Sequence, residues 1–534
     1  MAHFSARAGL KSLAFAALAT VAFSGIAAAE VVYNRGNDAD PETLDVHKTS
    51  SVAESNILRD LFDGLVIYDA KAEVVPGTAE KWTVSDDGKR YIFTLRADAK
   101  WSNGDPVKAS DFVFSYRRIM APETGAKYAN ILYPILNAEK INKGQAKPDE
   151  LGVKALDDRT VEITLERPTP YFLELLTHQT SLPVHQASVE KFGKDFVKPG
   201  NLVSNGAYML SEVVPNSYIR ARKNPHFYAA KDVQIDTVNF IPHPDLAAAV
   251  RRYQAGEIDS LNDLPADQIK SLRERFGGQV VLGPYLGVWC FPVNTSKAPF
   301  NDVRVRQALS LVIDREFIAD QIWGQTMVPA HSFVPPGINN YREPAQDAAK
   351  DLSPIDREEK AKALLKEAGY GPGLKPLKVE IRYNTTDNNR NTVVAVMNQW
   401  KAIGVEGSAI NTDTKTHFAY LRDGGDFDVA RYGWIGDYSD PQNFLFLLES
   451  DNKGFNYGKW KNAEYDALLR QAGTETDLKK RAETLYKAET IMMKELPWIP
   501  IMHYGTKNLI SPKLKGFQQN LRGVYPTRFL RKEG

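Results

Sequence analysis

The chain has 534 residues, 43% of them hydrophobic, so it can build more than one compact core, and its length favours two to four domains. Its 67 Lys and Arg residues nearly balance 66 Asp and Glu residues, which excludes the strongly basic character of proteins that bind nucleic acid or anionic membranes. The single cysteine, Cys290, excludes an intrachain disulfide, so the fold must depend on its hydrophobic cores.

The first 29 residues have the pattern of a secretory signal peptide. Basic Arg7 and Lys11 precede the apolar run "SLAFAALATVAFSGI", and the small residues "AAA" place the cleavage site after Ala29. A lipid-anchored precursor would need a cysteine at that site, and none is present there. No later stretch approaches the roughly 20 apolar residues that a membrane span requires. We therefore expect a free protein of the periplasm.

Helix and strand patterns follow one another through the first half of the chain. "SVAESNILRDLFDGLVIYD" predicts a helix that starts after Ser51 or Ser55, with an exit at Gly64 into an apolar strand. "KRYIFTLRADAKWSNGDPVKASDFVFSYRRI" predicts a strand, a turn at "SNGDP" and a helix capped by Ser110. "DRTVEITLERPTPYFLELLT" repeats this change from strand to helix.

From about residue 375 the elements alternate as in βαβ units. "PLKVEIRYNT" predicts a strand, "NRNTVVAVMNQWKAIG" a helix ended by Gly404, and "FDVARYGW" another strand. The preceding "DREEKAKALLKEAGYG" predicts a helix capped by Asp356, with Glu359 at capping-box spacing and Gly369 as its stop. The chain therefore contains at least two α/β lobes. The apolar strands "PYLGVWCFPVN" and "LPWIPIMHYG" are the candidates for the passages between them.

Motifs of catalysis and metal binding are missing from the sequence. It has no G-x-S-x-G elbow, no G-x-x-x-x-G-K-[ST] phosphate loop and no H-E-x-x-H zinc helix. Its nine histidines are scattered, and the closest pair is His178 and His185. Cys290 lies in an apolar strand, which favours a buried, inert thiol over a nucleophile. We expect a protein that is not an enzyme and that needs neither a metal nor another cofactor.

Five segments together carry a resemblance to a known family. They are "VAESNILRDLFDGL", "YIFTLRADAKWSNGDPVKASDFVFSYRR", "LVSNGAYML", "KAPFNDVRVRQALSLVIDRE" and "FDVARYGWIGDYSDP". Their order and spacing resemble those of the periplasmic oligopeptide-binding proteins of ABC importers, which are solute-binding proteins of family 5. Within that family the chain looks most like the oligopeptide and murein-peptide receptors, rather than the nickel or haem receptors.

This resemblance implies the fold class and the partners. The expected fold is α/β, the two-lobed periplasmic binding protein fold known as a Venus flytrap, with an extra domain in the N-terminal lobe. The expected domains are the signal peptide 1–29, lobe I (30–66, 188–286 and 507–534), the extra domain 67–187 and lobe II 287–506. The implied protein is a monomer that closes around a peptide ligand and presents it to the membrane permease of an ABC importer.

The resemblance also implies ligand-binding residues, first in the segment that ends "ARYGWIGDYSDP". A free peptide carries an ammonium group, and Asp437 stands where the family binds it; the alternative is an N-cap or Asx-turn residue. Arg431 matches a family arginine that meets carboxylates, with a buried structural ion pair as its alternative. Gly433 and Trp434 match the strand that faces the ligand, and Arg422 matches an arginine that reaches ligand termini. The alternative for Trp434 is a core tryptophan, and the alternative for Arg422 is an exposed surface charge.

Three more candidates come from the same comparison of motifs. Glu54 and Tyr128 match positions near the ligand, with a helix-start carboxylate and a packed tyrosine as alternatives. Asn389 stands where related receptors carry a histidine for the ligand carboxylate, and Trp323 takes the place of a pocket lysine. Both replacements remove positive charge from the implied site. They favour a ligand without a free carboxylate there, or a specialised ligand such as a murein peptide.

The sequence differs from related receptors at other positions too, and it leaves two alternative functions open. The residue after Arg422, a histidine in the best-known receptor, is Asp423 here, and the relatives' disulfide positions are Gly287 and Ile435 in this chain. A receptor for a non-peptide solute, such as an opine-like conjugate or an oligosaccharide, is the alternative function. An exported hydrolase is a remote one.

Overall fold

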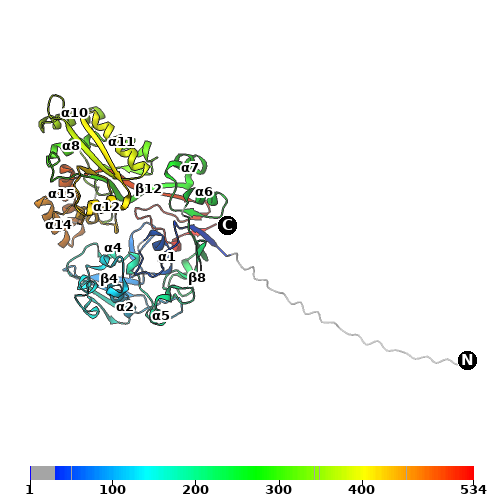
Figure 1. Cartoon of the computed structure of the whole chain (residues 1–534). Helices are drawn as coiled ribbons and strands as arrows, with labels where there is room; N and C mark the ends of the chain where they lie inside the picture. The colour runs from blue at the N-terminus through cyan, green and yellow to red at the C-terminus, as the bar shows by residue number, and fades with distance from the viewer. Residues whose placement is uncertain are drawn as a thin grey trace. The chain divides into compact units, whose positions relative to one another are not determined.

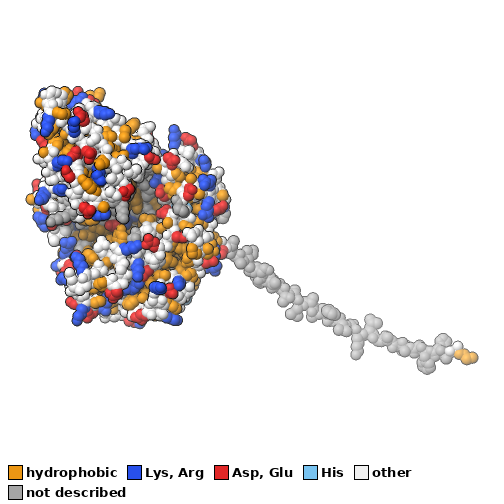
Figure 2. Space-filling view, viewed as in Figure 1, with side chains coloured by type: hydrophobic (Ala, Val, Ile, Leu, Met, Phe, Trp, Pro, Cys, Tyr) orange, Lys and Arg blue, Asp and Glu red, His pale blue; other side chains and the backbone are white. Residues whose placement is uncertain are grey.

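The computed structural model of the chain describes Met1 and residues 30–533, apart from residues 50, 244, 342, 348 and 453. The predicted signal peptide, apart from Met1, lies outside the described residues. Among the residues that are described, no helix combines the length and the apolar character needed to cross a membrane. Lys, Arg, Asp and Glu side chains are interspersed over the face seen in Figure 2, in keeping with the balanced charge of the sequence.

One large sheet runs through the protein. Its strands follow the order β17-β12-β18-β11-β1-β10-β9-β8, and β13 also pairs with β18. The strand β1 is parallel to β10 and β11, and the other neighbours are antiparallel. The bounds are β1 Val32–Gly36, β8 Tyr208–Val214, β9 Tyr218–Lys223, β10 Thr237–Ile241, β11 Ser260–Leu261, β12 Val280–Pro292, β13 Met327–Pro329, β17 Tyr432–Ile435 and β18 Trp498–Ile510.

The first predicted helix is α1, Val52–Leu61. Ser51 is its N-cap and forms a capping box with Glu54, which explains where the helix begins. Ile57, Leu58 and Leu61 are fully buried, as their spacing predicts. The chain then leaves through Gly64 into the short strand β2, Val66–Tyr68, which pairs with β3, Val74–Pro76.

A separate four-stranded sheet carries the next predicted strand and helix. Its order is β4-β5-β7-β6, with β4 Ala79–Val84, β5 Arg90–Leu95, β6 Val153–Asp157 and β7 Thr160–Thr164. The helix α2, Ala109–Met120, packs on it. The prediction that Ser110 caps this helix is wrong, because the helix already starts at Ala109. The carboxylate of Asp111 accepts a hydrogen bond from the main-chain N–H of Lys108 at 2.8 Å.

The βαβ alternation predicted after residue 375 is confirmed. The strands β15, β14 and β16 form a parallel sheet, and the helices α11 and α12 connect them. Their bounds are β14 Leu377–Asn384, α11 Asp387–Lys401, β15 Val405–Thr412, α12 Thr414–Arg422 and β16 Val429–Ala430. The preceding helix α10, Pro354–Glu367, has Ser353 as its N-cap, so the predicted cap at Asp356 is wrong: that residue lies inside the first turn.

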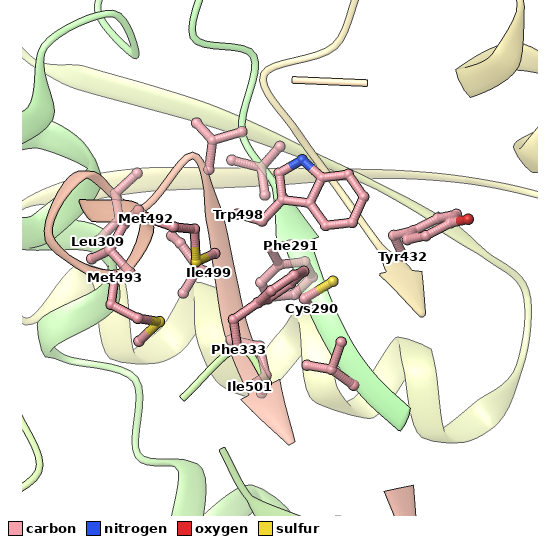
Figure 3. Packing of buried hydrophobic residues seen from close by; sticks show 14 of the residues in the cluster. Cys290, Phe291, Leu309, Phe333, Tyr432, Met492, Met493, Trp498, Ile499 and Ile501 are labelled. Atoms are coloured by element: carbon pink, nitrogen blue, oxygen red, sulfur yellow. The ribbon is translucent and has the colours of Figure 1, made fainter. Parts of the chain in front are cut away.

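The two apolar strands predicted as passages are β12 and β18. They pair with each other over most of their 13 residues, from Val280 opposite Leu509 to Pro292 opposite Trp498. Cys290 and Phe291 of β12 pack beside Ile499 and Ile501 of β18, as Figure 3 shows. Cys290 is completely buried, as predicted.

These strands connect two large hydrophobic cores. The first core is built mainly from residues 33–240 and 510–530, and the second from residues 286–502. Figure 1 shows α2, α4 and α5 among the helices of the first core and α8, α10, α11, α14 and α15 among those of the second. The predicted lobe boundaries at 286/287 and 506/507 fall inside β12 and β18, and we keep the domain division as a proposal.

The remaining helices and strands surround these cores or, in the case of α6 and α7, form a third, smaller hydrophobic cluster with residues of β10, β11, β12 and β18. They are α3 Ala138–Asn142, α4 Phe172–Leu175, α5 Gln186–Phe192, α6 Leu246–Gln254, α7 Ile269–Phe276, α8 Val303–Leu311, α9 Arg315–Phe317, α13 Gln442–Leu445, α14 Ala463–Thr474, α15 Leu478–Glu495, β19 Leu514–Lys515 and β20 Arg531–Lys532.

A buried ion pair ties α15 to the segment before α13. Both side chains of Arg481 and Asp440 are 1% exposed, and two hydrogen bonds of 2.7 and 2.8 Å join them. Asp440 also accepts a hydrogen bond from the main-chain N–H of Gln442 at 2.9 Å, so the same carboxylate holds the turn before α13.

Asp440→Asn should lower the free energy of unfolding by about 3 kcal/mol, because it leaves the guanidinium of Arg481 buried without a counter-charge. Urea unfolding followed by circular dichroism measures this change. The matched control is Glu139→Gln, which breaks the exposed pair with Lys143 and should cost less than about 1 kcal/mol. Equal losses in the two variants would contradict the role given to the buried pair.

Candidate ligand-binding site

A cavity of about 560 Å³ is lined by segments that are far apart in the chain. Its wall comes from α1, from the loops around Tyr128 and His178, from α12, from β17 and the residues after it, and from residues 522–524. Five of the eight predicted ligand-binding residues line it: Tyr128, Arg422, Gly433, Trp434 and Asp437. The cavity therefore gathers most of the residues that the motifs singled out.

Asp437 lies on a loop that main-chain hydrogen bonds hold in place. The guanidinium of Arg522 donates to the carbonyl oxygens of Gly436 and Asp437 at 2.6 and 2.8 Å. The N–H of Gly436 donates to the carbonyl of Leu286 at 2.8 Å. Among the described residues, the carboxylate of Asp437 makes no hydrogen bond and no ion pair. The alternative of an Asx turn or N-cap is therefore not what holds this side chain.

The electrostatic surroundings of Asp437 favour the binding of a cation. Burial raises the pKa of its carboxyl group above the ordinary value, and the nearby charge of Arg522 opposes the rise only in part. Burial also raises the pKa of the Tyr128 hydroxyl, and the charge of Asp437 raises it further. The ring of Tyr128 stacks on His178, with 5.2 Å between their centroids. A desolvated carboxylate without a partner gains most from an incoming ammonium group.

Gly433 and Trp434 lie on β17, opposite Trp289 and Val288 of β12. A Cβ atom at Gly433 would meet the hydroxyl of Tyr504, so glycine is needed there to leave room for that group. Trp434 lines the cavity, donates from Nε1 to Asn443 at 2.8 Å and packs edge-on against Phe455. The tryptophan is therefore at once a packed side chain and a cavity wall.

Arg431 is not part of the cavity wall but lies next to Gly433, which is, and it is only 9% exposed. Its guanidinium donates to Asn384 at 3.1 Å and to the hydroxyl of Tyr504 at 2.9 Å, and it approaches the ring of Trp289 at 5.4 Å. It makes no ion pair with any carboxylate in the described part of the chain. The alternative of a structural ion pair is therefore not seen, and its contact with ligand remains a prediction.

Glu54 and Asn389 are buried and do not line the cavity. Glu54 accepts a hydrogen bond from the N–H of Ser51 at 2.9 Å, which is the helix-start role given as its alternative. Asn389 donates to the carbonyl of Asn384 at 3.0 Å and accepts from Trp289 at 3.2 Å. Ligand contact by either residue remains a prediction.

Several lining residues are absent from the motif-based set. Val52, Ser55, Asn56 and Arg59 project from one face of α1, a spacing of three and four residues that could have revealed them once Glu54 was placed at the helix start. Among the others, Tyr285 lies at the irregular register of β12, and His178, Gln179 and Arg522 lie in segments where no periodic pattern marks them. Arg422, at the end of α12, is exposed and lines the cavity.

The positions that match the relatives' disulfide are neighbours in the sheet. Gly287 of β12 is the register partner of Ile435 of β17. A Cβ atom at Gly287 would lie 2.5 Å from the side chain of Ile435, so the isoleucine occupies the space that a second side chain would need. Packing therefore replaces the covalent link at this position.

Several known proteins are similar in sequence to this chain over most of its length. The family model described as "Bacterial extracellular solute-binding proteins, family 5 Middle" matches residues 73–456. The chain is 40% identical to the periplasmic murein peptide-binding protein MppA of Escherichia coli K12, over 90% of this chain and 89% of MppA. It is 39% identical to the periplasmic oligopeptide-binding protein OppA of Salmonella typhimurium, over 90% and 89% of the two chains. A further relative at 39% identity, over 92% of this chain and 91% of the relative, is the probable deoxycholate-binding periplasmic protein YgiS of Escherichia coli.

Solved structures agree with this assignment. The structure titled "MppA Periplasmic Murein Tripeptide Binding Protein, Unliganded Open Form" superimposes with a TM-score of 0.89 and 38% identity, covering 95% of this chain and 98% of that one. The two-lobed α/β fold expected from the motifs is thereby confirmed. The chain belongs to the bacterial extracellular solute-binding proteins of family 5.

Proposed function

We propose that this protein is a periplasmic receptor that captures peptides in the cavity beside Asp437 and delivers them to the permease of an ABC importer. The observation that carries the proposal is the carboxylate of Asp437, which lines the cavity, is desolvated and has no partner among the described residues. The family membership and the names of MppA and OppA support peptides as the ligand class.

The strand β17 supports the same ligand class. It is the terminal strand of the large sheet and pairs on one side with β12, so its other edge has no strand partner among the described residues. Gly433, Trp434 and Ile435 of this strand line the cavity. An extended peptide can add to such an edge through main-chain hydrogen bonds, which bind it without selecting its side chains.

The mechanism of capture is closure of the two lobes around the ligand. The cavity wall includes residues on both sides of the strands β12 and β18, so a ligand that touches both sides favours the closed arrangement over the open one. The permease then distinguishes a loaded receptor by its closure. No step of this cycle requires a covalent change in the ligand, and we propose that the protein acts as a monomer.

A bile acid is the competing ligand class, because one relative is named for probable deoxycholate binding. Such a molecule has an apolar body and one carboxylate but no ammonium group. Its affinity should not fall when the charge of Asp437 is removed, because like charges repel, whereas a peptide needs that charge. The two ligand classes are therefore separable by one substitution.

Asp437→Asn should weaken the binding of unmodified tripeptides about 100-fold, because it removes the counter-charge of a desolvated ammonium group. Isothermal titration calorimetry on protein freed of copurified ligand measures the effect. An N-acetylated tripeptide, which has no ammonium group, should bind the parent protein as weakly as the plain peptide binds the variant. The matched control is Asp149→Asn, an exposed carboxylate that is not part of the cavity wall and that should leave affinity unchanged.

Tight deoxycholate binding that Asp437→Asn does not weaken, together with no peptide binding, would replace the peptide proposal by the competing one. Mass spectrometry of the peptide after incubation provides the test for a hydrolase. Recovery of the intact peptide is the expected result, and cleavage would contradict a pure binding role.

The same substitution should stabilise the protein without ligand. The pKa of Asp437 is raised in the folded state, so its ionisation opposes folding at neutral pH. Asp437→Asn should therefore increase the free energy of unfolding at pH 7 by up to about 1 kcal/mol. This gain should shrink as the pH falls through the raised pKa of the carboxyl group. Chemical unfolding between pH 7 and pH 4 measures the trend, and a variant less stable than the parent at pH 7 would contradict it.

A further inference from the structure

Guanidinium groups outnumber carboxylates around the cavity. Arg59, Arg422 and Arg522 line it, whereas Asp437 is the one acidic residue among the described residues that form its wall. Arg431 lies beneath Gly433, with a guanidinium nitrogen 3.2 Å from where a Cβ atom would be. Trp323 and Asn389, at which the resemblance implies a loss of positive charge, are not part of this wall.

Arg59 is held by neutral groups. Its Nε donates to the hydroxyl of Ser55 at 3.0 Å, and its Nη1 donates to the carbonyl of Thr177 at 2.6 Å. It forms no ion pair with any described carboxylate. Burial lowers the pKa of Arg59 to about 10, and the neighbouring charge of Arg522 acts in the same direction. Two of its five N–H groups have these acceptors, and the other three have none among the described residues.

Arg522 approaches the same aromatic ring as Arg59. Their guanidinium carbons lie 5.8 and 5.5 Å from the centroid of Tyr68. The acid behind this ring is Glu174, which is buried and accepts hydrogen bonds from the hydroxyl of Tyr68 at 2.7 Å and from the amide of Asn339 at 2.8 Å. Both of its carboxylate oxygens therefore have neutral donors, and it forms no ion pair with either arginine in the described chain.

The charge balance has a consequence for the ligand. In the described wall of the cavity, the guanidinium groups of Arg59, Arg422 and Arg522 stand against the single carboxylate of Asp437. A peptide with one ammonium and one carboxylate is neutral overall, so its binding leaves this excess in place. Desolvated guanidinium groups are best satisfied by carboxylates, which they bind with two parallel hydrogen bonds.

The excess positive charge adjoins the end of the cavity that holds Asp437. The ring of His178 stacks on Tyr128, and the charge of Asp437 raises the pKa of the Tyr128 hydroxyl. Burial, together with the charges of Arg59 and Arg522, lowers the pKa of His178 to about 3, so this histidine is neutral at pH 7. It therefore adds no further charge and leaves the arginines as the cations of this end.

We propose that Arg59, assisted by Arg522, binds a carboxylate that the ligand carries close to its ammonium group, so that the receptor selects peptides with an acidic first or second residue. This inference rests on the proposed function, because the ammonium group is placed at Asp437.

The test uses the unaltered protein and pairs of tripeptides that differ by one charge. Isothermal titration calorimetry at low salt compares Ala-Glu-Ala with Ala-Gln-Ala and Asp-Ala-Ala with Asn-Ala-Ala. In at least one pair, the acidic peptide should bind tenfold or more tightly than its amide counterpart. Affinities that agree within twofold in both pairs would overturn the inference and leave the peptide function standing. If none of the four peptides binds, the proposed function fails together with the inference.

Substitution then assigns the preference to Arg59. Arg59→Gln should reduce the ratio of the two affinities to near one and leave the affinity for the amide peptide within about threefold. Arg59→Lys keeps the charge and should retain part of the preference. The matched control is Arg251→Gln, an exposed arginine on α6, which should keep the full ratio. A full preference in a folded Arg59→Gln variant, shown by an unchanged melting temperature, would overturn the role of this residue.

Discussion

Partial burial of a charge without a partner opposes folding, and this chain bears such a cost at the half-buried carboxylate of Asp437. The carboxylate lines the cavity without an ion pair in the described structure, while Arg522 uses its donors on the carbonyl oxygens of the same loop. The loop is thereby fixed although its charge stays unsatisfied. A site prepared in this way binds a cation with little reorganisation, because the loop is already in place.

The fold explains why this loop can face both halves of the molecule. The strands β12 and β18 run as a pair between the two cores, and β17 extends their sheet at its edge, so Asp437 follows directly after the edge strand. Beyond it, Tyr438 stacks on Tyr171 with parallel rings 4.9 Å apart. The acceptor therefore lies where elements of the second core meet a helix-rich segment of the first. A ligand bound there touches the elements whose relative position has to change on closure.

Local patterns predicted the elements well, and tertiary contacts account for what they missed. The capping box of Ser51 and Glu54, the βαβ alternation and the two long apolar strands depend on residues close in sequence or on a regular period. The caps at positions 110 and 356 were misplaced because other residues of the same polar type, or a neighbouring carboxylate, compete for the helix start. Arg522 and the pairing of Arg481 with Asp440 had no local signal, because each depends on residues at least 41 positions away.

Only the part of the site that lies in the family motifs could be predicted from the sequence. The resemblance predicted that Asp437, Trp434 and Arg422 bind the ligand, and all three line one cavity. It could not show that Arg59 and Arg522 add positive charge to the cavity wall.

A crystal structure with a bound tripeptide at neutral pH tests the central claim most directly. The account predicts that the terminal nitrogen of the peptide lies about 3 Å from a carboxylate oxygen of Asp437. A terminal nitrogen surrounded by water, or a carboxylate turned away from the ligand, would contradict it.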